Sequence, residues 1–313
     1  MTALPGHNNP PADPIAEPPP EAVVTEGSDA LRNQPPLPAL PPEASLPVAG
    51  RSRLLLAGED ILAGLRLWRL GGSLGWLDVR LQFRGSLVGP LWLTLTTAVM
   101  VGAMGLVYAR LFGVVLHDYL PYLAISMILW QAGVSGVTGE ACTCFIRAAD
   151  SIRSVRLPYS VQILRMLTRI AVTFAFTIVV PLAVCAWYRV LPGFQGLLAI
   201  PALGLWIINA FAWGLLLAPL CTRYRDIPPI ISSAVQLLFY VTPVIWSVRQ
   251  LGDKGKWLIL NPFYSLLEIV RGPLTGHAPS AAVWAVACGT SLALWLAGLW
   301  TFSRARASLA FWI

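Results

Sequence analysis

The sequence predicts an all-α polytopic membrane protein with six transmembrane helices, an amphipathic N-terminal interfacial helix and a re-entrant outer hairpin between spans five and six. Of its 313 residues, 56% are apolar and only 12% are charged, whereas about 25% are charged in soluble domains. Long segments without Asp, Glu, Lys or Arg recur after residue 85, and one span needs about 20 apolar residues. This composition excludes an ordinary cytosolic enzyme, a disordered regulator and a nucleic-acid-binding domain, so we expect no nucleic-acid partner.

Residues 1–50 form a Pro-rich acidic tail that we expect to be disordered. They contain 13 of the 26 prolines, and they carry six carboxylates against one arginine. Proline removes backbone donors, and the segment has little apolar surface to bury. A docking site of the PxxP type at Pro35-Pro36-Leu37-Pro38 is one interpretation. A solvated extension without a partner is the other.

Residues 51–85 are expected to form the amphipathic interfacial helix. Ile61, Leu65 and Trp68 follow helical spacing, and the pattern restarts after Gly71-Gly72. Leucine and tryptophan suit the acyl boundary of the inner leaflet, and the arginines between them suit the head groups. A plain membrane anchor and a cuff around a lipid-linked substrate both fit this pattern.

Residues 86–313 make up the predicted six-helix transmembrane domain. Each crossing must be helical because lipid offers no partner to free backbone groups. No Asp, Glu, Lys or Arg lies deep in the predicted spans, which argues against a proton relay inside the chain. The spans are residues 87–109, 119–139, 170–188, 197–220, 229–248 and 280–302.

The distribution of Lys and Arg predicts the orientation. From residue 51 onward, the segments on the N-terminal side of the six crossings carry 15 of these residues, and the opposite segments carry six. Cytoplasmic loops of membrane proteins hold the excess of positive charge. We therefore expect a multi-pass protein of the plasma membrane with both termini in the cytoplasm, in contact with membrane lipid.

The loop between spans two and three contains a short amphipathic helix. Ile152 and Val155 share one face, Arg153 and Arg156 share another, and the segment ends before Pro158. A helix of this kind can dock into the groove of a partner protein. A solvated connector has the same pattern, so the residues alone leave both interpretations open.

The loop between spans five and six, near residues 249–279, is too apolar to be free and too interrupted to cross the membrane. Asn261-Pro262 suits the N-terminal cap of a helix, and Glu268 and Arg271 can pair three residues apart. Irregular backbone survives at membrane depth only where protein or a cavity covers it. These features predict the re-entrant hairpin.

No pattern of residues predicts a catalytic or metal-binding site. The five cysteines match no zinc or disulfide framework, and the three histidines are scattered. The sequence contains no G-x-x-x-x-G-K-[ST] motif. We expect no cofactor bound by this chain, and a pump built on it would carry ATP and Mg²⁺ on another polypeptide.

From about Asp78 to Phe302, several motifs follow one another in a defined order. They are Gln82-Phe83-Arg84-Gly85-Ser86-Leu87-Val88-Gly89-Pro90-Leu91-Trp92, Tyr119-Leu120-Pro121-Tyr122 with Trp130, Val155-Arg156-Leu157-Pro158, Arg223-Tyr224-Arg225-Asp226-Ile227, Thr242-Pro243-Val244-Ile245 and Asn261-Pro262-Phe263. In this order the sequence resembles the transmembrane subunit of a type-2 ABC exporter for polysaccharide, the permeases for O-antigen, capsule and teichoic acid. Gln82 and Phe83 depart from the Arg-Tyr that is usual in that family.

The resemblance implies a homodimer with two ABC ATPase subunits that moves a polyprenyl-diphosphate-linked glycan outward across the bacterial inner membrane. The partner hydrolyses ATP, so this chain is a permease and not an enzyme. The implied coupling helix toward the ATPase comprises Ile152, Arg153, Val155, Arg156, Leu157 and Pro158. The implied outer gate comprises Asn261, Pro262, Phe263, Tyr264, Glu268 and Arg271.

Two further sets of residues are candidates for contact with the glycan lipid. Arg84, Arg223 and Arg225 lie at the inner mouth, where guanidinium groups suit a lipid diphosphate; anchoring by positive charge, with Asp226 as a local partner, is the alternative. Aromatic side chains of the spans can stack on sugars in a channel or pack against lipid and other helices. They are Trp92, Tyr108, Trp130, Trp206, Trp213, Tyr240 and Trp246.

Other classes of protein stay open at this point. An ABC permease for a drug or a small lipid would have the same architecture. A membrane transferase acting on a lipid-linked sugar would need an acid or base at the membrane face, for which Glu140, Asp150 and Asp226 are the candidates. A scaffold that transports nothing would not need the re-entrant hairpin.

Overall fold

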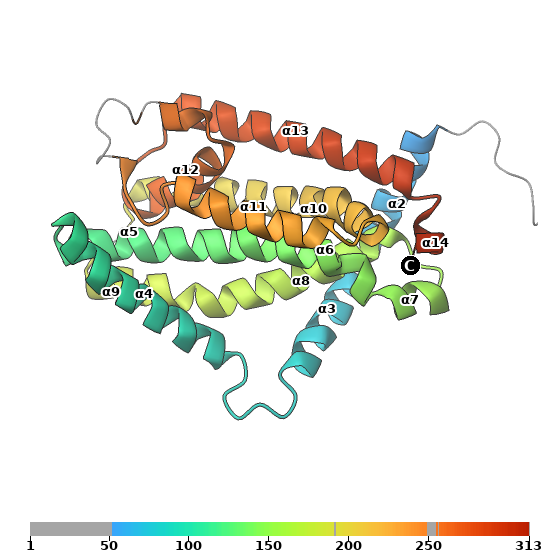
Figure 1. Ribbon diagram of the computed structural model, residues 1–313, viewed down its shortest axis with the longest axis horizontal. Helices are drawn as coiled ribbons and strands as arrows, with labels where there is room; N and C mark the ends of the chain where they lie inside the picture. Colours follow the sequence, from blue (N-terminus) through green and yellow to red (C-terminus); the bar gives the residue numbers. More distant parts are fainter. Residues whose placement is uncertain (1–51, 191, 249–254, 256, 313) are drawn as a thin grey trace, which may run out of the picture. The chain divides into compact units, whose positions relative to one another are not determined.

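The computed structural model describes residues 52–190, 192–248, 255 and 257–312 (Figure 1). The chain divides into two units, Met1–Gly50 and Arg51–Ile313, and all described residues belong to the second. The tail predicted for residues 1–50 lies outside the described residues. Every regular element in the described part of the chain is a helix, as the sequence predicts.

Five helical segments of the described part are long and apolar enough to cross a membrane. They agree with predicted spans one to four and six, but the second and third extend well past the predicted boundaries. The charged side chains that ended those uncharged stretches are ion-paired inside the fold, so the helices continue through them. The five segments are α4 (Leu91–Phe112); α5 (Leu116–Ile128), η2 (Leu129–Gly136) and α6 (Val137–Arg147); α8 (Tyr159–Thr177) and α9 (Val179–Trp187); η3 (Phe194–Leu198) and α10 (Ala199–Arg223); and α13 (Ala281–Ala305).

The fifth predicted span, residues 229–248, is a shorter helix in the structure. α11 covers Ile227–Val241, 15 residues, which is about 22 Å at 1.5 Å per residue and less than the roughly 30 Å of a hydrocarbon core. Thr242 is already extended, with ψ 138°, because the residue before a proline disfavours the α conformation and Pro243 follows. The count of six spans is therefore not confirmed by helix length.

α10 and α13 pack together and run in the same direction. Asn209 donates from Nδ2 to Ser291 Oγ at 2.9 Å. Further along both helices, a Cβ on Gly298 would lie 2.9 Å from the carbonyl oxygen of Ala212. The chain between these two parallel helices must return along the bundle, and α11 lies on that path (Figure 1).

α2 (Arg53–Arg66) and α3 (Trp68–Gln82) precede the first span and pack on α8. The structure has two helices where one interfacial helix was expected, because the chain turns at Leu67, and α3 continues through both Gly71 and Gly72. Glycine costs only about 1 kcal/mol in a helix interior, and here it permits close packing against Leu164 of α8. Exposed leucine and tryptophan side chains on both helices fit the predicted interfacial position, which stays a prediction.

Short helices occupy the two ends of the helical bundle (Figure 1). α7 (Ala149–Ser154) and α14 (Leu309–Trp312) lie at one end, and α12 (Pro262–Leu274) lies at the other. Two clusters of buried apolar side chains follow this division. We refer to the two regions as the α7 end and the α12 end. α12 is the helix expected between the last two spans; the re-entrant path of the hairpin stays a prediction.

Candidate functional site

The predicted coupling segment is a surface helix at the α7 end. α7 follows the turn at Ala148 and ends at Ser154, and none of its residues is buried. Val155 is extended, with φ −134° and ψ 130°, and it is 53% exposed. Gln162 of α8 donates to Ser151 Oγ at 3.4 Å. The segment is therefore accessible to a partner and at the same time tied to the helix that follows.

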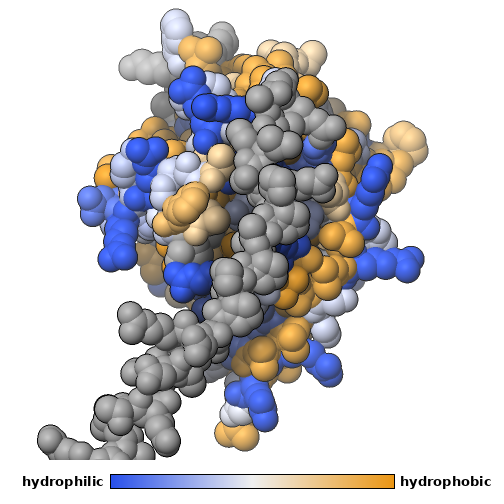
Figure 2. All heavy atoms as spheres, turned by 90° about the vertical axis from the view of Figure 1, so that its right-hand side faces the viewer, coloured by the Kyte–Doolittle hydropathy of each residue, from blue (hydrophilic) through white to orange (hydrophobic). Residues whose placement is uncertain are grey.

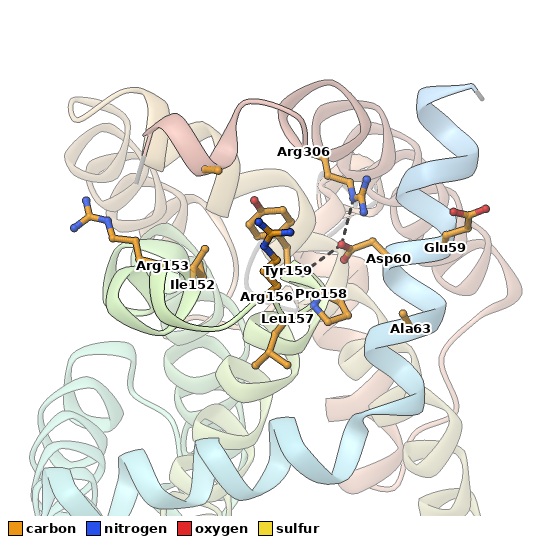
Figure 3. Close-up of a pocket in the computed structure, with 11 residues that line it drawn as sticks. Glu59, Asp60, Ala63, Ile152, Arg153, Arg156, Leu157, Pro158, Tyr159 and Arg306 are labelled. Carbon is orange, nitrogen blue, oxygen red and sulfur yellow. Dashed lines mark hydrogen bonds and ion pairs between the residues drawn. The ribbon is translucent and has the colours of Figure 1, made fainter. Parts of the chain in front are cut away.

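A hollow of about 690 Å³ lies beside α7 (Figure 3). Its walls come from α2, from α7 and the segment that joins it to the start of α8, and from the C-terminal part of the chain. Five of the six predicted coupling residues line it, and Val155 does not. The lining residues are Glu59, Asp60, Ala63, Ile152, Arg153, Arg156, Leu157, Pro158, Tyr159, Arg306 and Ala310.

Asp60 of α2 joins three helices beside this hollow. Its carboxylate accepts from the backbone N–H of Tyr159 at 3.3 Å and of Ser160 at 3.1 Å, and Arg306 donates to it from Nε at 3.2 Å. The first N–H groups of a helix have no partner within it, and Pro158 offers α8 no side-chain cap. Asp60 supplies that cap from a helix about 100 residues earlier, a contact that sequence analysis did not predict.

The α7 end carries many hydrophilic side chains. Figure 2 looks onto this end and shows them around its rim, with hydrophobic side chains between them. At the end of α10, the guanidinium of Arg223 lies over the rings of Tyr224 and Trp312, 5.0 Å from each centroid. This gathering of arginine at one end agrees with the charge asymmetry from which the orientation was predicted.

The three arginines predicted to contact a lipid diphosphate do not form one group within the chain. Arg223 ends α10 and Arg225 lies in the turn that follows it, whereas Arg84 lies in the turn after α3. Figure 1 shows the connection from α3 to α4 well separated from the α10–α11 turn. Their role in binding a diphosphate stays a prediction.

A network of charged side chains that sequence analysis missed joins α3, α6 and α8. Arg165 of α8 donates to both carboxylate oxygens of Asp78 of α3, at 2.5 and 2.6 Å. Arg169, one turn later, donates to Asp78 and to Glu140 of α6, at 2.7 Å each. We refer to these four residues as the Asp78–Glu140 network. Burial raises the pKa of Asp78, but the hydrogen bonds from the two guanidinium groups outweigh it and hold the pKa below its usual value.

The sequence contains one signal for this network, the i, i+4 spacing of Arg165 and Arg169, which places both on one face of a helix. That spacing does not identify the partners, because Asp78 is about 90 residues away. Glu140, a candidate acid for a transferase, is occupied by Arg169 and also by Arg147, at 3.2 Å.

At the α12 end, the predicted cap and the predicted ion pair both form. The side chain of Asn261 accepts from the N–H groups of Phe263 and Tyr264, at 3.0 and 3.4 Å, and so opens α12. Arg271 pairs with Glu268, three residues earlier, and its own side chain is only 2% exposed. Whether this helix is an outer gate stays a prediction.

Arg271 also binds groups from two other segments. Its guanidinium donates to Tyr122 Oη at 2.8 Å and to Ser126 Oγ at 3.1 Å, both on α5, and to the carbonyl oxygen of Pro243 at 2.7 Å. It lies 4.5 Å from the centroid of the Tyr122 ring. Motifs that are far apart in the sequence therefore meet at one buried cation, and we refer to this group as the Arg271 cluster.

Two of the predicted channel aromatics hold the chain together. Trp130 is 3% exposed and lies between the rings of Phe239 and Phe263, 5.7 and 6.0 Å from them. Trp206 donates from Nε1 to the carbonyl oxygen of Leu266 at 2.8 Å. For these two residues the structure favours helix packing over contact with a sugar.

The other five predicted aromatics differ in exposure. Trp92 and Tyr240 are exposed, whereas Tyr108, Trp213 and Trp246 are half-buried. The exposed pair is free of the dense packing around Trp130, so a ligand or lipid can reach these rings.

Comparison with known proteins identifies the family. The ABC-2 type transporter family matches residues 72–275, which run from within α3 to the end of α12. The chain belongs to the ABC-2 type transporter family. The match includes α7, the Asp78–Glu140 network and the Arg271 cluster, whereas Asp60 and Arg306 beside the hollow lie outside it.

Relatives of this ABC-2 chain include three proteins named O-antigen export system permease protein RfbA. One from Klebsiella pneumoniae is 22% identical over 231 residues, which cover 73% of this chain and 89% of the relative. A second from the same organism is 24% identical over 192 residues, 61% of this chain and 74% of the relative. One from Myxococcus xanthus is 25% identical over 229 residues, 70% of this chain and 86% of the relative.

Proposed function

We propose that this chain is the membrane-spanning permease subunit of an ATP-driven ABC transporter that exports a polyprenyl-diphosphate-linked, O-antigen-like polysaccharide. The observation that carries the proposal is the family match over residues 72–275, together with relatives named as O-antigen export permeases along up to 73% of the chain. Five helices long enough to cross a membrane fit a permease.

In this proposal, two copies of the chain form a homodimer with two ABC ATPase subunits, which bind ATP and Mg²⁺. The α7 segment supports docking because it lies on the surface between two spans and none of α7 is buried. Apolar and cationic side chains, such as Leu157 and Arg156, meet at the adjacent hollow, which suits insertion into a partner's groove. The chain itself then has no catalytic residue and binds no cofactor.

The glycan lipid would cross the bacterial inner membrane from the inner to the outer leaflet, with both termini of the chain in the cytoplasm. The arginine-rich α7 end would face the cytoplasm, where guanidinium groups attract a lipid diphosphate. The Arg271 cluster would close the opposite end. Glu140 is a poor candidate for the acid of a transferase, because two arginines already bind it.

Purification of the tagged chain from its native membranes in mild detergent, with mass spectrometry of co-purifying proteins, tests this proposal. We expect an equimolar partner with a G-x-x-x-x-G-K-[ST] motif. Val155→Asp places a charge on the exposed coupling segment and should release that partner, so that undecorated lipid-linked glycan accumulates inside the cell. Val115→Asp is the matched control, because Val115 is also exposed, at 68%, but precedes α5 at the opposite end.

Recovery of the chain alone, in several detergents and with an ATP analogue present, would show that the proposal is wrong. An unchanged surface glycan after deletion of the gene would count equally against it. If Val115→Asp and Val155→Asp release the ATPase to the same extent, the partner does not dock at the α7 end.

A further inference from the structure

α3 approaches α8 without side chains between the two backbones. A Cβ on Gly75 would lie 2.5 Å from the carbonyl oxygen of Arg165 and 2.6 Å from Thr168 Cβ. A Cβ on Gly71, one turn earlier, would lie 2.8 Å from Leu164 Cβ. Contacts this short with backbone leave no room for a methyl group, so two glycines four residues apart fix the spacing of the helices.

Polar contacts tie α8 to α2 at its first turn and to α3 further along. Asp60 of α2 caps the first turn of α8 through Ser160. Further along, Asp78 of α3 receives three hydrogen bonds from Arg165 and Arg169. Hydrogen bonds between a carboxylate and guanidinium groups are stronger and more directional than hydrogen bonds between neutral groups. α2 and α3 therefore have little freedom to slide along α8.

The same contacts extend to the helices on either side of α7. Arg169 binds Glu140 of α6, the helix that leads into α7. Gln162 of α8 binds Ser151 within α7. A force applied to α7 therefore acts on α6 and α8 together, and through the Asp78–Glu140 network on α3.

The connection from α3 to α4 is loosely packed, unlike the contact between α3 and α8. It runs through residues 83–90, where Gly85 has φ +83° and Gly89 has φ +58°, and a Cβ on either glycine would meet nothing within 4 Å. Figure 1 shows α3 and α4 inclined in opposite directions on either side of this segment. Glycines in left-handed conformations and open surroundings are suited to a bend.

We propose that α2, α3, α6, α7 and α8 move as one rigid body when the ATPase engages α7, and that the chain bends between α3 and α4 at residues 83–90. This inference rests on the proposed function, because the ATPase supplies the force. Asp78, Arg165, Arg169 and Glu140 are positioning residues in it. They transmit the movement of α7 to the helix that leads into the first span.

Distances between spin labels in the complex with its ATPase, in lipid nanodiscs, test the proposal. Cysteines are placed at exposed Ser73 of α3 and Ala171 of α8, and in a second sample at Ser73 and Val99 of α4, with exposed Cys288 replaced by alanine. We expect the α3–α8 distance to stay the same when a non-hydrolysable ATP analogue binds, whereas the α3–α4 distance shifts. A shift between α3 and α8, or no shift between α3 and α4, would overturn the proposal.

Two alanine substitutions add a functional measurement. Gly75→Ala forces α3 away from α8 and should increase the α3–α8 distance, with loss of glycan export while ATP hydrolysis persists. Gly72→Ala is the control, because its Cβ would only reach Thr168 Oγ1 at 4.0 Å. Normal export by Gly75→Ala would contradict the proposal.

The outcomes also separate this inference from the proposed function. A wild-type preparation without ATPase would refute the proposed function, and this inference with it. An intact complex in which the α3–α8 distance changes would refute this inference alone.

Discussion

Arg271 is a cation that the fold buries almost completely, with 2% of its side chain exposed. A buried charge is tolerated only where it is paired and hydrogen-bonded, and Arg271 meets Glu268, Tyr122, Ser126 and a carbonyl oxygen at once. Ser126 and Pro243 are buried, and Tyr122 and Glu268 are half-buried. Removal of the cation therefore leaves several polar groups without a partner.

Arg271→Gln should lower the free energy of unfolding by about 3 kcal/mol, the lower part of the range for breaking a buried ion pair. Denaturation of the purified chain in mixed micelles measures this change. Arg110→Gln removes an exposed arginine at the last turn of α4, which is also near the α12 end, and serves as the control. Equal effects of the two substitutions would mean that the Arg271 cluster contributes little to stability.

The long helix formed by α5, η2 and α6 is irregular in the middle, where it contacts Trp206. Its central part, Leu129–Gly136, is a π-helix, a form that usually occurs in short stretches and often at functional sites. Within it, Gly133 lies directly against the ring of Trp206 of η3–α10, and a Cβ there would come 1.5 Å from Cζ3. The ring of a predicted channel aromatic thus fills the space left by a missing side chain.

Gly133→Ala should destabilise the fold by about 1–3 kcal/mol, the usual cost of overpacking. Gly139→Ala lies six residues later in α6, where a Cβ would meet nothing within 4 Å, and it should be neutral or stabilising by up to about 1 kcal/mol. Unfolding midpoints of the two variants, measured under the same conditions, give the comparison. If Gly133→Ala lowers the free energy of unfolding no more than Gly139→Ala does, the Trp206 ring moves aside at little cost.

On the scale of the whole molecule, the ion-paired clusters described above are divided between the two ends of the bundle. The Asp78–Glu140 network and Asp60 join helices at the α7 end, and the Arg271 cluster joins them at the α12 end. Between them, the outward faces of α4, α10 and α13 are largely apolar, with exposed residues such as Leu106, Ile207 and Leu296. An apolar middle between two ends that carry the charged clusters is the arrangement of a membrane protein.

The lowered pKa of Asp78 makes part of this stability dependent on pH. An Asp whose folded-state pKa lies below its unfolded value of about 3.9 stabilises the fold fully above that value and loses the contribution as the pH falls through the folded-state pKa. Wild-type protein should therefore be more stable than Asp78→Asn at about pH 6, and the difference should shrink below about pH 4. Thermal unfolding across this range measures it, and a difference that does not change with pH would contradict the assignment.

The sequence by itself determined the features that depend on neighbouring residues. Uncharged stretches located the five long helices, Asn261-Pro262 identified the start of α12, and the three-residue spacing of Glu268 and Arg271 identified an ion pair that does form. These predictions succeeded because helix formation, capping and i, i+3 pairing are local. Local patterns did not show the turn at Leu67, which divides the single interfacial helix expected over residues 51–85 into α2 and α3.

Only the tertiary structure decided which distant groups meet. Asp60 and Ser160, Asp78 and Arg169, and Tyr122 and Arg271 are each separated by about 90 to 150 residues. A charged side chain that is buried needs a partner. The sequence does not show where in the chain that partner lies. The helices of the second and third predicted spans continue past the predicted boundaries for the same reason, since the charged residues at those boundaries are paired with residues on other helices. Helix packing brings those residues together, and no local pattern encodes it.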